Sequence, residues 1–303
     1  MQEEIIMKKT LAMMTAAMMV AGALAGCGSS SSTPAATTAA ATEAATTAAA
    51  TEAATTEAAG DTTAAAEGTV KTPSGKFTVG FDQEFPPMGF VGDDGEFTGF
   101  DLDLAKEVAS RLGLEFVPQP INWDAKDMEL ESGNIDCIWN GFTMQGREDA
   151  YTWVGPYMAN NQVFVVNADS DIASKADLAG KAVEVQKDSS GLAALQDDAE
   201  LSASFGSMTE VADYNTALMD LESGACDAVC MDSIVAGYQI KSSGKDMKIL
   251  DDTLSAEEYG IGFKKGEDEL AKAVYDTLME MKDDGTVAKI SNDRFGSDVF
   301  TLK

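Results

Sequence analysis

Residues 136–147 read D-C-I-W-N-G-F-T-M-Q-G-R, and this stretch joins a buried strand to a group of polar side chains. Its first four residues are typical of a short buried strand that begins after the turn at 132–134. Gly141, which lets a ligand approach the backbone, Thr143 and Arg147 follow. A guanidinium just past a strand end can grip a carboxylate through two parallel hydrogen bonds. We therefore predict a carboxylate-binding site at Arg147.

The residues that lead into this stretch recur later in the chain. Residues 130–138 and 221–229 both read L-E-S-G-x-x-D-x-(I/V), a pattern typical of a helix end, a glycine turn and a buried strand. The first copy leads to Arg147 and the second to Asp232. Two matching units that end in opposite charges suggest two lobes facing one zwitterion. The alternative is the coincidental recurrence of a common helix–turn–strand arrangement.

The start of the chain has the features of an export signal. Met7 is a better start than Met1, because Lys8 and Lys9 then lead directly into an apolar segment. The segment is short for a membrane span and ends in L-A-G-C at Cys27. This ending resembles the lipobox of bacterial lipoproteins, in which the cysteine becomes the diacylated first residue. We expect a signal peptide over residues 1–26; an ordinary signal with a chance cysteine is the alternative.

A tether is expected between Cys27 and the rest of the chain. Residues 27–68 are rich in Ser, Ala and Thr and have almost nothing to bury, so burial cannot offset their chain entropy. We predict a disordered spacer between a lipid on Cys27 and a head that begins at residue 69. The head is long enough for two lobes.

The charge balance excludes several classes of protein. The 303-residue chain has 51 acidic and 21 basic residues, a formal charge of −30, which excludes a nucleic-acid footprint. The same charge opposes electrostatic attachment to anionic lipid, so we expect membrane contact only through the lipid anchor on the outer face of the cell membrane. The chain has no histidine, so we expect no zinc site of the usual kind. We also expect no other metal and no cofactor. Cys226 and Cys230 are too far apart on one strand for a disulfide, and buried free thiols are expected.

Strands alternate with helices along the head, which predicts an α/β fold. Residues 76–82 alternate apolar and polar side chains and predict a strand that ends at Asp82. A proline-stiffened loop follows and presents Phe85, which either stacks on a ligand or packs in the core. Asp101 is expected to cap the next helix. Trp123 stands at a strand-to-helix turn, where α/β sheets present ligand-facing groups.

A second anionic-ligand site is suggested by Ser189 and Ser190, which precede an expected helix. Hydroxyl and backbone N–H groups at a helix start bind anions, and they serve equally well as an ordinary N-cap. Later, the strand expected at 226–231 ends in Asp232.

At these residues the chain resembles the extracellular solute-binding proteins of polar-amino-acid ABC importers. The resemblance covers about residues 76–295 and rests on motifs in the family's order: F-D-x-x-F-P-P-M-G-F, G-F-D-L-D-L-A, the two L-x-S-G-x-x-D stretches, T-x-x-G-R and Y-G-I-G-F-K-K-G. It implies a two-lobed α/β fold of the periplasmic-binding-protein type II class. Residues 69–160 plus 258–303 would form lobe 1 and residues 161–257 lobe 2, joined by two crossing strands.

The resemblance also implies roles for individual residues. The carboxylate-gripping arginine of the family falls on Arg147, and its ammonium-binding aspartate falls on Asp232. The other implied substrate-binding residues form the first loop, the apolar wall, the strand-end contacts of lobe 1 and the anion turn of lobe 2: Asp82, Phe85, Trp123, Asn140, Gly141, Thr143, Ser189 and Ser190.

Two departures from the family's pattern affect these roles. The loop from Thr143 to Arg147 is one residue shorter than usual, with Gln145 where a second threonine is common. Asp188 stands where the family usually has glycine, and its charge would oppose a ligand carboxylate unless it points to solvent.

The implied function is capture of a free, polar L-amino acid by a monomer, without bond chemistry, and its delivery to the transmembrane subunits of an ABC permease. One alternative is a dehydratase-type enzyme on the same scaffold, which would need a positioned acid or base. Another is a sensory lipoprotein that binds ligand without transport.

The side chain of the ligand stays open at this point. Asp82 and Asp188 would favour a cationic side chain. Phe85, Trp123 and Trp139 would equally wall a neutral one, including that of cystine.

Overall fold

The computed structural model describes Thr72 and residues 74–303. The predicted signal peptide (1–26), the Cys27 lipidation site and the tether (27–68) lie outside these residues.

Eight strands form one mixed sheet with the order β5-β1-β6-β11-β7-β10-β8-β9. Its pairs are parallel except those that involve β7 or β11, which run antiparallel to each other, to β10 and to β6. The strands are β1 (Lys76–Phe81), β5 (Glu115–Pro120), β6 (Cys137–Thr143), β7 (Tyr151–Asn167), β8 (Ala182–Gln186), β9 (Ser207–Val211), β10 (Ala228–Asp232) and β11 (Met247–Lys264). A second, small sheet contains β2 (Glu84–Phe85), β3 (Gly89–Val91) and β4 (Phe97–Thr98).

Helices follow most of the strands, as the alternating pattern predicts. They are α1 (Phe100–Leu112), α2 (Lys126–Ser132), α3 (Ser190–Asp197), α4 (Ala199–Ser204), α5 (Tyr214–Ser223), α6 (Ser233–Ser243), α7 (Asp268–Asp283) and α8 (Thr286–Phe295), with short 3-10 helices η1 (Trp123–Ala125) and η2 (Lys175–Leu178). None of the helices within the described part of the chain has the length and apolar character of a membrane span.

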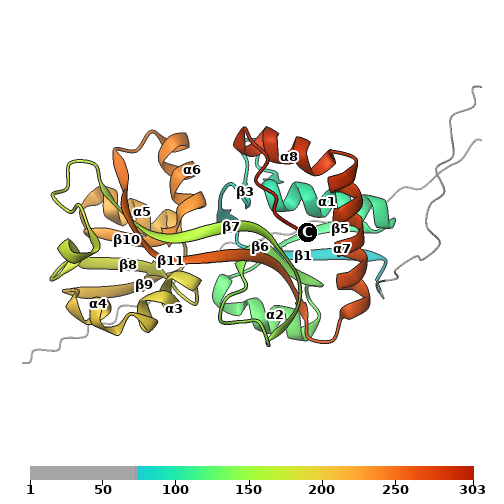
Figure 1. The fold of residues 1–303 in the computed structure, drawn as a ribbon, viewed down its shortest axis with the longest axis horizontal. Coiled ribbons are helices and arrows are strands. Elements are labelled where there is room, and N and C mark those ends of the chain that lie inside the picture. Colours follow the sequence, from blue (N-terminus) through green and yellow to red (C-terminus); the bar gives the residue numbers. More distant parts are fainter. Residues whose placement is uncertain (1–71, 73) are drawn as a thin grey trace, which may run out of the picture. The chain divides into compact units, whose positions relative to one another are not determined.

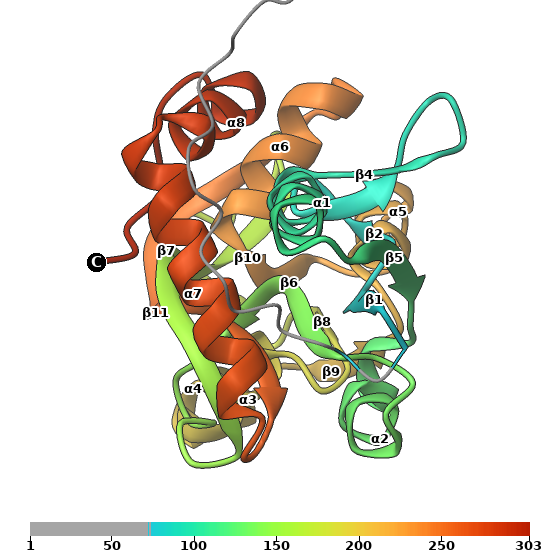
Figure 2. The ribbon, with the colours of Figure 1, turned by 90° about the vertical axis from the view of Figure 1, so that its right-hand side faces the viewer.

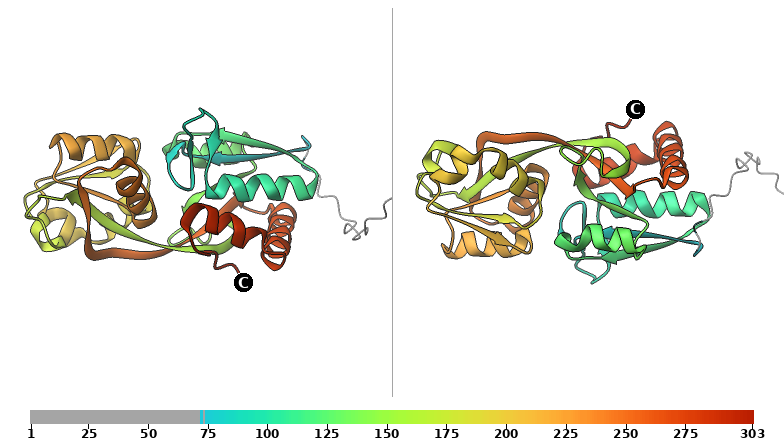
Figure 3. Two further views of the ribbon diagram at one scale, coloured as in Figure 1. Left: turned by 90° about the horizontal axis from the view of Figure 1, so that it is seen from above. Right: turned by 90° about the horizontal axis from the view of Figure 1, so that it is seen from below.

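Strands β7 and β11 run side by side through both lobes and connect them (Figures 1 and 3). Their register pairs Tyr151 with Lys264 at one end and Asn167 with Met247 at the other. In lobe 1, β11 pairs with β6; in lobe 2, β7 pairs with β10. The predicted two-lobed α/β fold with two crossing strands is therefore confirmed. The expected lobe boundaries, at 160/161 and 257/258, fall within these two strands.

Strand β6 is buried along its whole length because helices cover both faces of the lobe 1 sheet. Cys137 and Trp139 pack into the core that α1 and α7 share, whereas Ile138 and Phe142 pack with Leu130 of α2. Helices α1 and α2 accordingly lie on opposite sides of β1 and β6 (Figure 2). Because helices pack on both faces of β6, its C-terminal end, which carries predicted site residues, is held in place.

The two copies of the repeated sequence have the same local structure. Gly133 and Gly224 end α2 and α5 in the left-handed conformation, both with φ of 77° and ψ of 19°. The aspartate of each copy then accepts a backbone N–H from a neighbouring strand: Asp136 from Thr78 at 2.6 Å and Asp227 from Ala182 at 2.8 Å. These hydrogen bonds hold β6 in register against β1 in lobe 1 and β10 in register against β8 in lobe 2.

The expected cap of α1 is wrong. The helix begins at Phe100, Gly99 occupies the N-cap position, and Asp101 lies inside the first turn with its side chain directed elsewhere. A tertiary hydrogen bond to the backbone of Gly141 outcompetes local capping, as described below.

The cysteines in the described part of the chain, Cys137, Cys226 and Cys230, are free and buried. This agrees with the spacing argument against a disulfide between Cys226 and Cys230.

Candidate functional site

A narrow cavity of about 10 Å³ lies where the two lobes touch. That volume has room for about one water molecule. Lobe 1 and lobe 2 both contribute to its lining, which consists of Phe85, Trp123, Gly141, Thr143, Arg147, Gln186, Ser189, Ser190 and Asp232. The structure therefore brings together all of the predicted site residues except Asp82 and Asn140.

Arg147 reaches this cavity from a tight turn after β6. The Arg147 N–H donates to the Met144 carbonyl at 3.0 Å, and Gly146 has a φ of 77°, which a type II turn needs at that position. The shortened loop is thus a compact turn. The guanidinium donates to the Thr143 carbonyl at 3.2 Å and lies 5.2 Å from the centre of the Phe142 ring.

Arg147 differs from the other two arginines in its charge partners. Arg111 forms ion pairs with Glu107 and Asp284, and Arg294 forms one with Asp103. Arg147 has no carboxylate partner among the described residues. A half-buried guanidinium that hydrogen-bonds only carbonyl oxygens keeps donors available for an anion.

Gly141 needs its lack of a side chain for two reasons. Its φ is 58°, and a Cβ there would lie 2.9 Å from the Phe85 ring and 3.2 Å from the Tyr259 ring. The Gly141 N–H donates to the buried Asp101 carboxylate at 2.7 Å, which also accepts the Tyr157 hydroxyl at 2.8 Å. Burial raises the pKa of Asp101 to about 7. Through the hydrogen bond from Gly141, Asp101 thus holds the C-terminal part of β6 in place.

The two serines stand at the start of α3, opposite β6. Ser189 caps the helix by accepting the Leu192 N–H at 3.1 Å. The Ser190 hydroxyl lies 3.2 Å from the Thr143 hydroxyl of lobe 1 and accepts the Gln162 amide at 3.1 Å. Ser189 is therefore an ordinary N-cap, and both serines also line the cavity.

Asp232 ends β10 and is buried among neutral hydrogen-bond donors. One carboxylate oxygen accepts the Asn160 amide at 2.7 Å and the Tyr259 hydroxyl at 2.6 Å, and the other accepts the Tyr214 hydroxyl at 3.3 Å. Burial, followed by the nearby Glu257 carboxylate, raises the pKa of Asp232 to about 8.

Two aromatic side chains bound the cavity on the lobe 1 side. Phe85 is buried and packs against Tyr214 of lobe 2, with ring centres 5.9 Å apart. Trp123 is half-buried and meets the Phe142 ring edge to face at 5.6 Å. Trp139 is different, because it is completely buried in the core beside Tyr157. The expectation that Trp139 walls the ligand is therefore wrong.

Asp82 and Asn140 lie next to the cavity without lining it. The Asn140 side-chain oxygen accepts the Asp82 N–H at 3.0 Å. One Asp82 oxygen accepts the Gln186 amide of lobe 2 at 2.7 Å, and the other accepts the Glu84 N–H at 2.9 Å. Burial raises the pKa of Asp82 to about 6. Asn140 supports the loop, and Asp82 ties that loop to lobe 2.

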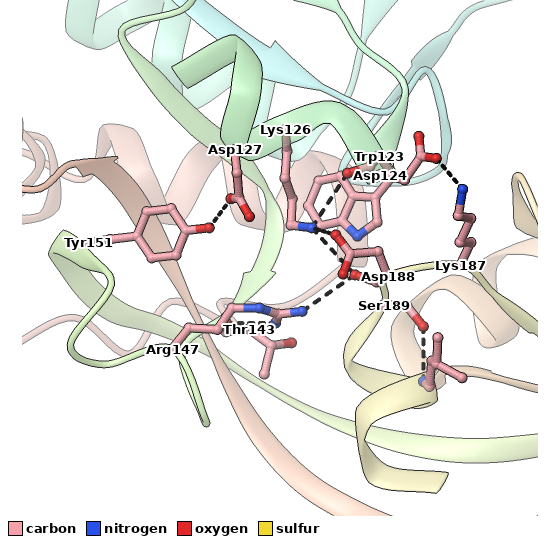
Figure 4. A network of polar contacts seen from close by, with 11 residues as sticks. Trp123, Asp124, Lys126, Asp127, Thr143, Arg147, Tyr151, Lys187, Asp188 and Ser189 are labelled. Atoms are coloured by element: carbon pink, nitrogen blue, oxygen red, sulfur yellow. Dashed lines mark hydrogen bonds and ion pairs between the residues drawn. The ribbon is translucent and has the colours of Figure 1, made fainter. Parts of the chain in front are cut away.

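The Asp188 carboxylate is neither directed at Arg147 nor left without a partner, although the Arg147 guanidinium donates to the Asp188 backbone carbonyl at 3.5 Å. The carboxylate and the backbone carbonyl of Asp188 both accept from Lys126, a nearly buried side chain at the start of α2 (Figure 4). Its φ of 56° is unusual for a residue other than glycine. Close by, Lys187 of lobe 2 pairs with Asp124 of lobe 1 at 2.6 Å (Figure 4). The aspartate that replaces the usual glycine thus links the two lobes.

A larger chamber of about 830 Å³ adjoins the narrow cavity, with which it shares Trp123. Six carboxyl groups and one lysine line it: Asp82, Glu84, Asp124, Glu129, Glu210, Asp213 and Lys187. The net charge of this lining is strongly negative at neutral pH.

Sequence reasoning missed several residues around the site. Gln186 ends β8 beside the cavity, and the strand-end rule that found Asp232 applies to it as well. Lys126, Asn160 and Glu257 give no such signal, because their roles depend on contacts between elements distant in sequence. Within the described residues, no group of three or more Cys, Asp or Glu side chains could hold a metal ion.

Comparison with known proteins agrees with this geometry. Residues 77–297 match the family of bacterial extracellular solute-binding proteins, family 3. The L-cystine-binding protein TcyJ of Escherichia coli is 31% identical over 231 residues, which cover 74% of this chain and 84% of that protein. The L-cystine-binding protein TcyA of Bacillus subtilis is 32% identical over 229 residues, which cover 74% and 83%.

A solved structure is similar over the same region. The histidine-bound substrate-binding protein of an ABC uptake transporter from Streptococcus pneumoniae has a TM-score of 0.73 and 34% sequence identity; the match covers 75% of this chain and 95% of that one. The family match spans most of the chain and includes most of both lobes. The chain therefore belongs to the bacterial extracellular solute-binding proteins, family 3.

Proposed function

We propose that this protein captures a free L-amino acid between its two lobes and delivers it to the transmembrane subunits of an ABC permease. One observation carries the proposal: Arg147 of lobe 1 and Asp232 of lobe 2, side chains of opposite charge type, line the same cavity. An amino acid presents a carboxylate and an ammonium on one carbon, so a lobe-spanning pair of this kind matches its head group. The relatives that bind cystine and histidine support the same class of ligand.

Each end of the amino acid would have its own set of donors or acceptors. Arg147 and the N–H groups at the start of α3 would hold the carboxylate, with Thr143 and Ser190 at its side. Asp232 would accept the ammonium. Phe85 and Trp123 would cover the apolar part of the ligand from lobe 1.

Ligand entry requires the two lobes to separate. The narrow cavity has room for about one water molecule, and contacts such as Thr143–Ser190 close it. After an amino acid docks on lobe 1, closure of lobe 2 would exclude water and strengthen both charge pairs. The closed form is stabilised only by as much as the ligand prefers it, and this form would be the one that the permease recognises.

The adjoining chamber favours a ligand whose far end is positively charged. Six carboxyl groups against one lysine create a negative potential there. The cationic ends of arginine and lysine, or the second ammonium of cystine, would gain from that potential. Asp188 contributes little to this preference, because Lys126 compensates its charge.

The chain's attachment is part of the proposal. We propose that residues 1–26 direct export, that a lipid on Cys27 anchors a monomeric protein at the outer face of the membrane, and that residues 27–68 act as a tether. We also propose that residues 69–160 with 258–303, and residues 161–257, form the two lobes.

A thermal-shift screen tests the function. The chain would be produced from residue 27 with Cys27→Ser, freed of carried-over ligand by unfolding and refolding, and screened against the common L-amino acids, cystine and several metabolites that are not amino acids. A ligand that binds only the folded chain must raise its melting temperature. We expect a rise with one or a few amino acids that Arg147→Ala abolishes. A screen without any amino-acid hit would contradict the proposal.

A further inference from the structure

A second buried carboxylate, that of Glu257, lies behind Asp232. Glu257 is on β11, one of the two crossing strands, directly opposite Asn160 on β7. Only 6% of its surface is exposed. Glu257 does not line the cavity, so it makes none of the proposed contacts to the amino acid.

One amide bridges the two carboxylates. The Asn160 side-chain nitrogen donates to Asp232 at 2.7 Å and to Glu257 at 2.6 Å, and the same Glu257 oxygen accepts the Gln162 amide at 3.0 Å. These amides are neutral. Neither carboxylate takes part in an ion pair among the described residues.

The other titratable groups around the pair do not supply a positive charge. Tyr214 of α5, Tyr259 of β11 and Cys230 of β10 face it, and burial raises the pKa of each well above its ordinary value, so they stay neutral. Tyr157 of β7 lies behind Tyr259 and is neutral for the same reason. Arg147 is the one cation that lines the adjoining cavity.

Two adjacent carboxylates without a buried cation cannot both stay ionised at moderate cost, so the more deeply buried Asp232 retains a proton. The ammonium of an amino acid is the cation that the proposed function would bring to Asp232. A protonated carboxyl group can still accept a hydrogen bond, but it lacks the negative charge that a buried ammonium needs, so binding of the ammonium favours loss of the proton.

We propose that Asp232 carries a proton in the free protein, held there by its burial and by the adjacent Glu257 carboxylate, and that docking of the ligand ammonium on Asp232 expels this proton to solvent. The ammonium keeps its own three protons, and the O–H bond of the carboxyl group breaks. Glu257 is thus a positioning residue that makes capture depend on pH. This inference rests on the proposed function.

The affinity for the amino acid should rise with pH. The free protein holds the proton below a pH of about 8, and the complex does not, so binding below that pH includes the cost of proton loss. Affinity should rise about tenfold per pH unit between pH 6 and pH 8, and it should level off where the free protein no longer holds the proton.

Isothermal titration calorimetry of the Cys27→Ser chain with its amino-acid ligand tests the proposal. At pH 6.5 the binding enthalpy is measured in buffers of different ionisation enthalpy, and we expect release of nearly one proton per ligand. Infrared difference spectra of the unmutated site should show the loss of a protonated-carboxyl band on binding. Binding with a buffer-independent enthalpy and no change in that band would overturn the inference and leave the proposed function intact. Absence of amino-acid binding would overturn both.

Two matched variants assign the effect to Glu257. Glu257→Gln keeps the acceptor for Asn160 and removes the charge, so it should shift the rising part of the affinity profile to lower pH and reduce proton release at pH 6.5. Glu258→Gln changes the next residue, which is exposed, and should behave like the unmutated chain. If Glu257→Gln folds and keeps the original pH profile, Glu257 has no part in holding the proton.

Discussion

Lys126 of lobe 1 donates to both the side chain and the backbone carbonyl of Asp188 of lobe 2. The Lys126 side chain is 2% exposed and that of Asp188 is 52% exposed. Loss of this contact should make separation of the lobes easier. Because a half-exposed ion pair contributes about 0.2–1 kcal/mol, Lys126→Met and Asp188→Gly should each weaken amino-acid binding by up to about fivefold. Calorimetric titration measures this change.

Glycine accepts the φ of 56° at position 188, so Asp188→Gly should not strain the backbone of this turn. Lys272→Met, which breaks a surface ion pair with Asp276 on α7, is the control and should not change affinity. The radius of gyration of the ligand-free chain in solution should rise in the two interlobe variants. Unchanged affinity and radius in both would show that this contact does not hold the lobes together.

Arg147→Ala should abolish measurable binding, with a loss of at least about 100-fold, because a bidentate charge-assisted contact disappears. Arg147→Lys should recover only part of the affinity, since an ammonium lacks the planar fork. Arg111→Ala removes a surface arginine from α1 and should leave binding unchanged. Fluorescence or calorimetric titration distinguishes the three variants, and full affinity in Arg147→Ala would exclude Arg147 as the carboxylate contact.

Substitution of two glycines, one beside the cavity and one away from it, tests how closely the side chains around the cavity pack. Gly133 and Gly141 both have positive φ, but a Cβ at Gly133 would meet nothing within 4 Å, whereas one at Gly141 would meet the Phe85 and Tyr259 rings. Gly133→Ala should therefore cost only about 1 kcal/mol in the free energy of unfolding. Gly141→Ala should cost more and should also weaken binding. Urea unfolding and ligand titration measure the two effects, and equal behaviour of the variants would contradict the packing argument.

Stability should fall as the pH rises from about 4 to about 8. Burial raises the pKa values of Asp82, Asp101 and Asp232 to about 6, 7 and 8, against an ordinary value of 3.8 in the unfolded chain. The native state therefore binds more protons across this range, and each unit of pKa shift corresponds to about 1.4 kcal/mol. Urea unfolding at pH 5, 6.5 and 8 measures the slope.

Asp101→Asn should flatten this slope, because asparagine still offers an oxygen to the Gly141 N–H and does not titrate. Asp94→Asn, at an exposed turn, should keep the slope of the unmutated chain. A stability that rises from pH 5 to pH 8 would show that these carboxyl groups are ionised in the native state.

The acidic chamber predicts a selective effect of charge removal. Glu210→Gln should weaken binding of an amino acid with a cationic far end by a few-fold and leave any neutral ligand of the same site unaffected. Glu200→Gln on α4 is the matched surface control. Competition assays with both classes of ligand, at low and high salt, measure the difference. An equal loss for both classes would show that the chamber does not read the charge of the ligand.

Short-range patterns predicted the parts of the fold that depend on local physics. The turns at Gly133 and Gly224 were predictable because glycine readily adopts the positive φ that ends a helix. The buried strands after them were predictable from their apolar runs. Arg147 was predictable because it is the one arginine of three that follows shortly after a buried strand. The repeat also indicated the opposing position of Asp232.

Residues whose roles depend on contacts between distant elements escaped prediction. Asp101 had the sequence context of a helix cap, but its carboxylate accepts the Gly141 N–H forty residues away. Apolar and polar residues alternate too weakly around Glu257 to show which side chains are buried. Pairing of β11 with β7 decides which of them face the interior. The charge of Asp188 looked unfavourable because its partner, Lys126, comes from the other lobe.

The order of the chain has a consequence for how this protein folds as it emerges. Lobe 1 is built from both ends of the described chain, since β11, α7 and α8 complete what β1, α1 and β6 begin. Until β11 and α7 are released, β6 lacks its antiparallel neighbour and the apolar face of α1 lacks α7. The first lobe therefore stays incomplete until the C-terminal elements β11 and α7 are made, whereas residues 161–257 can begin to pack earlier.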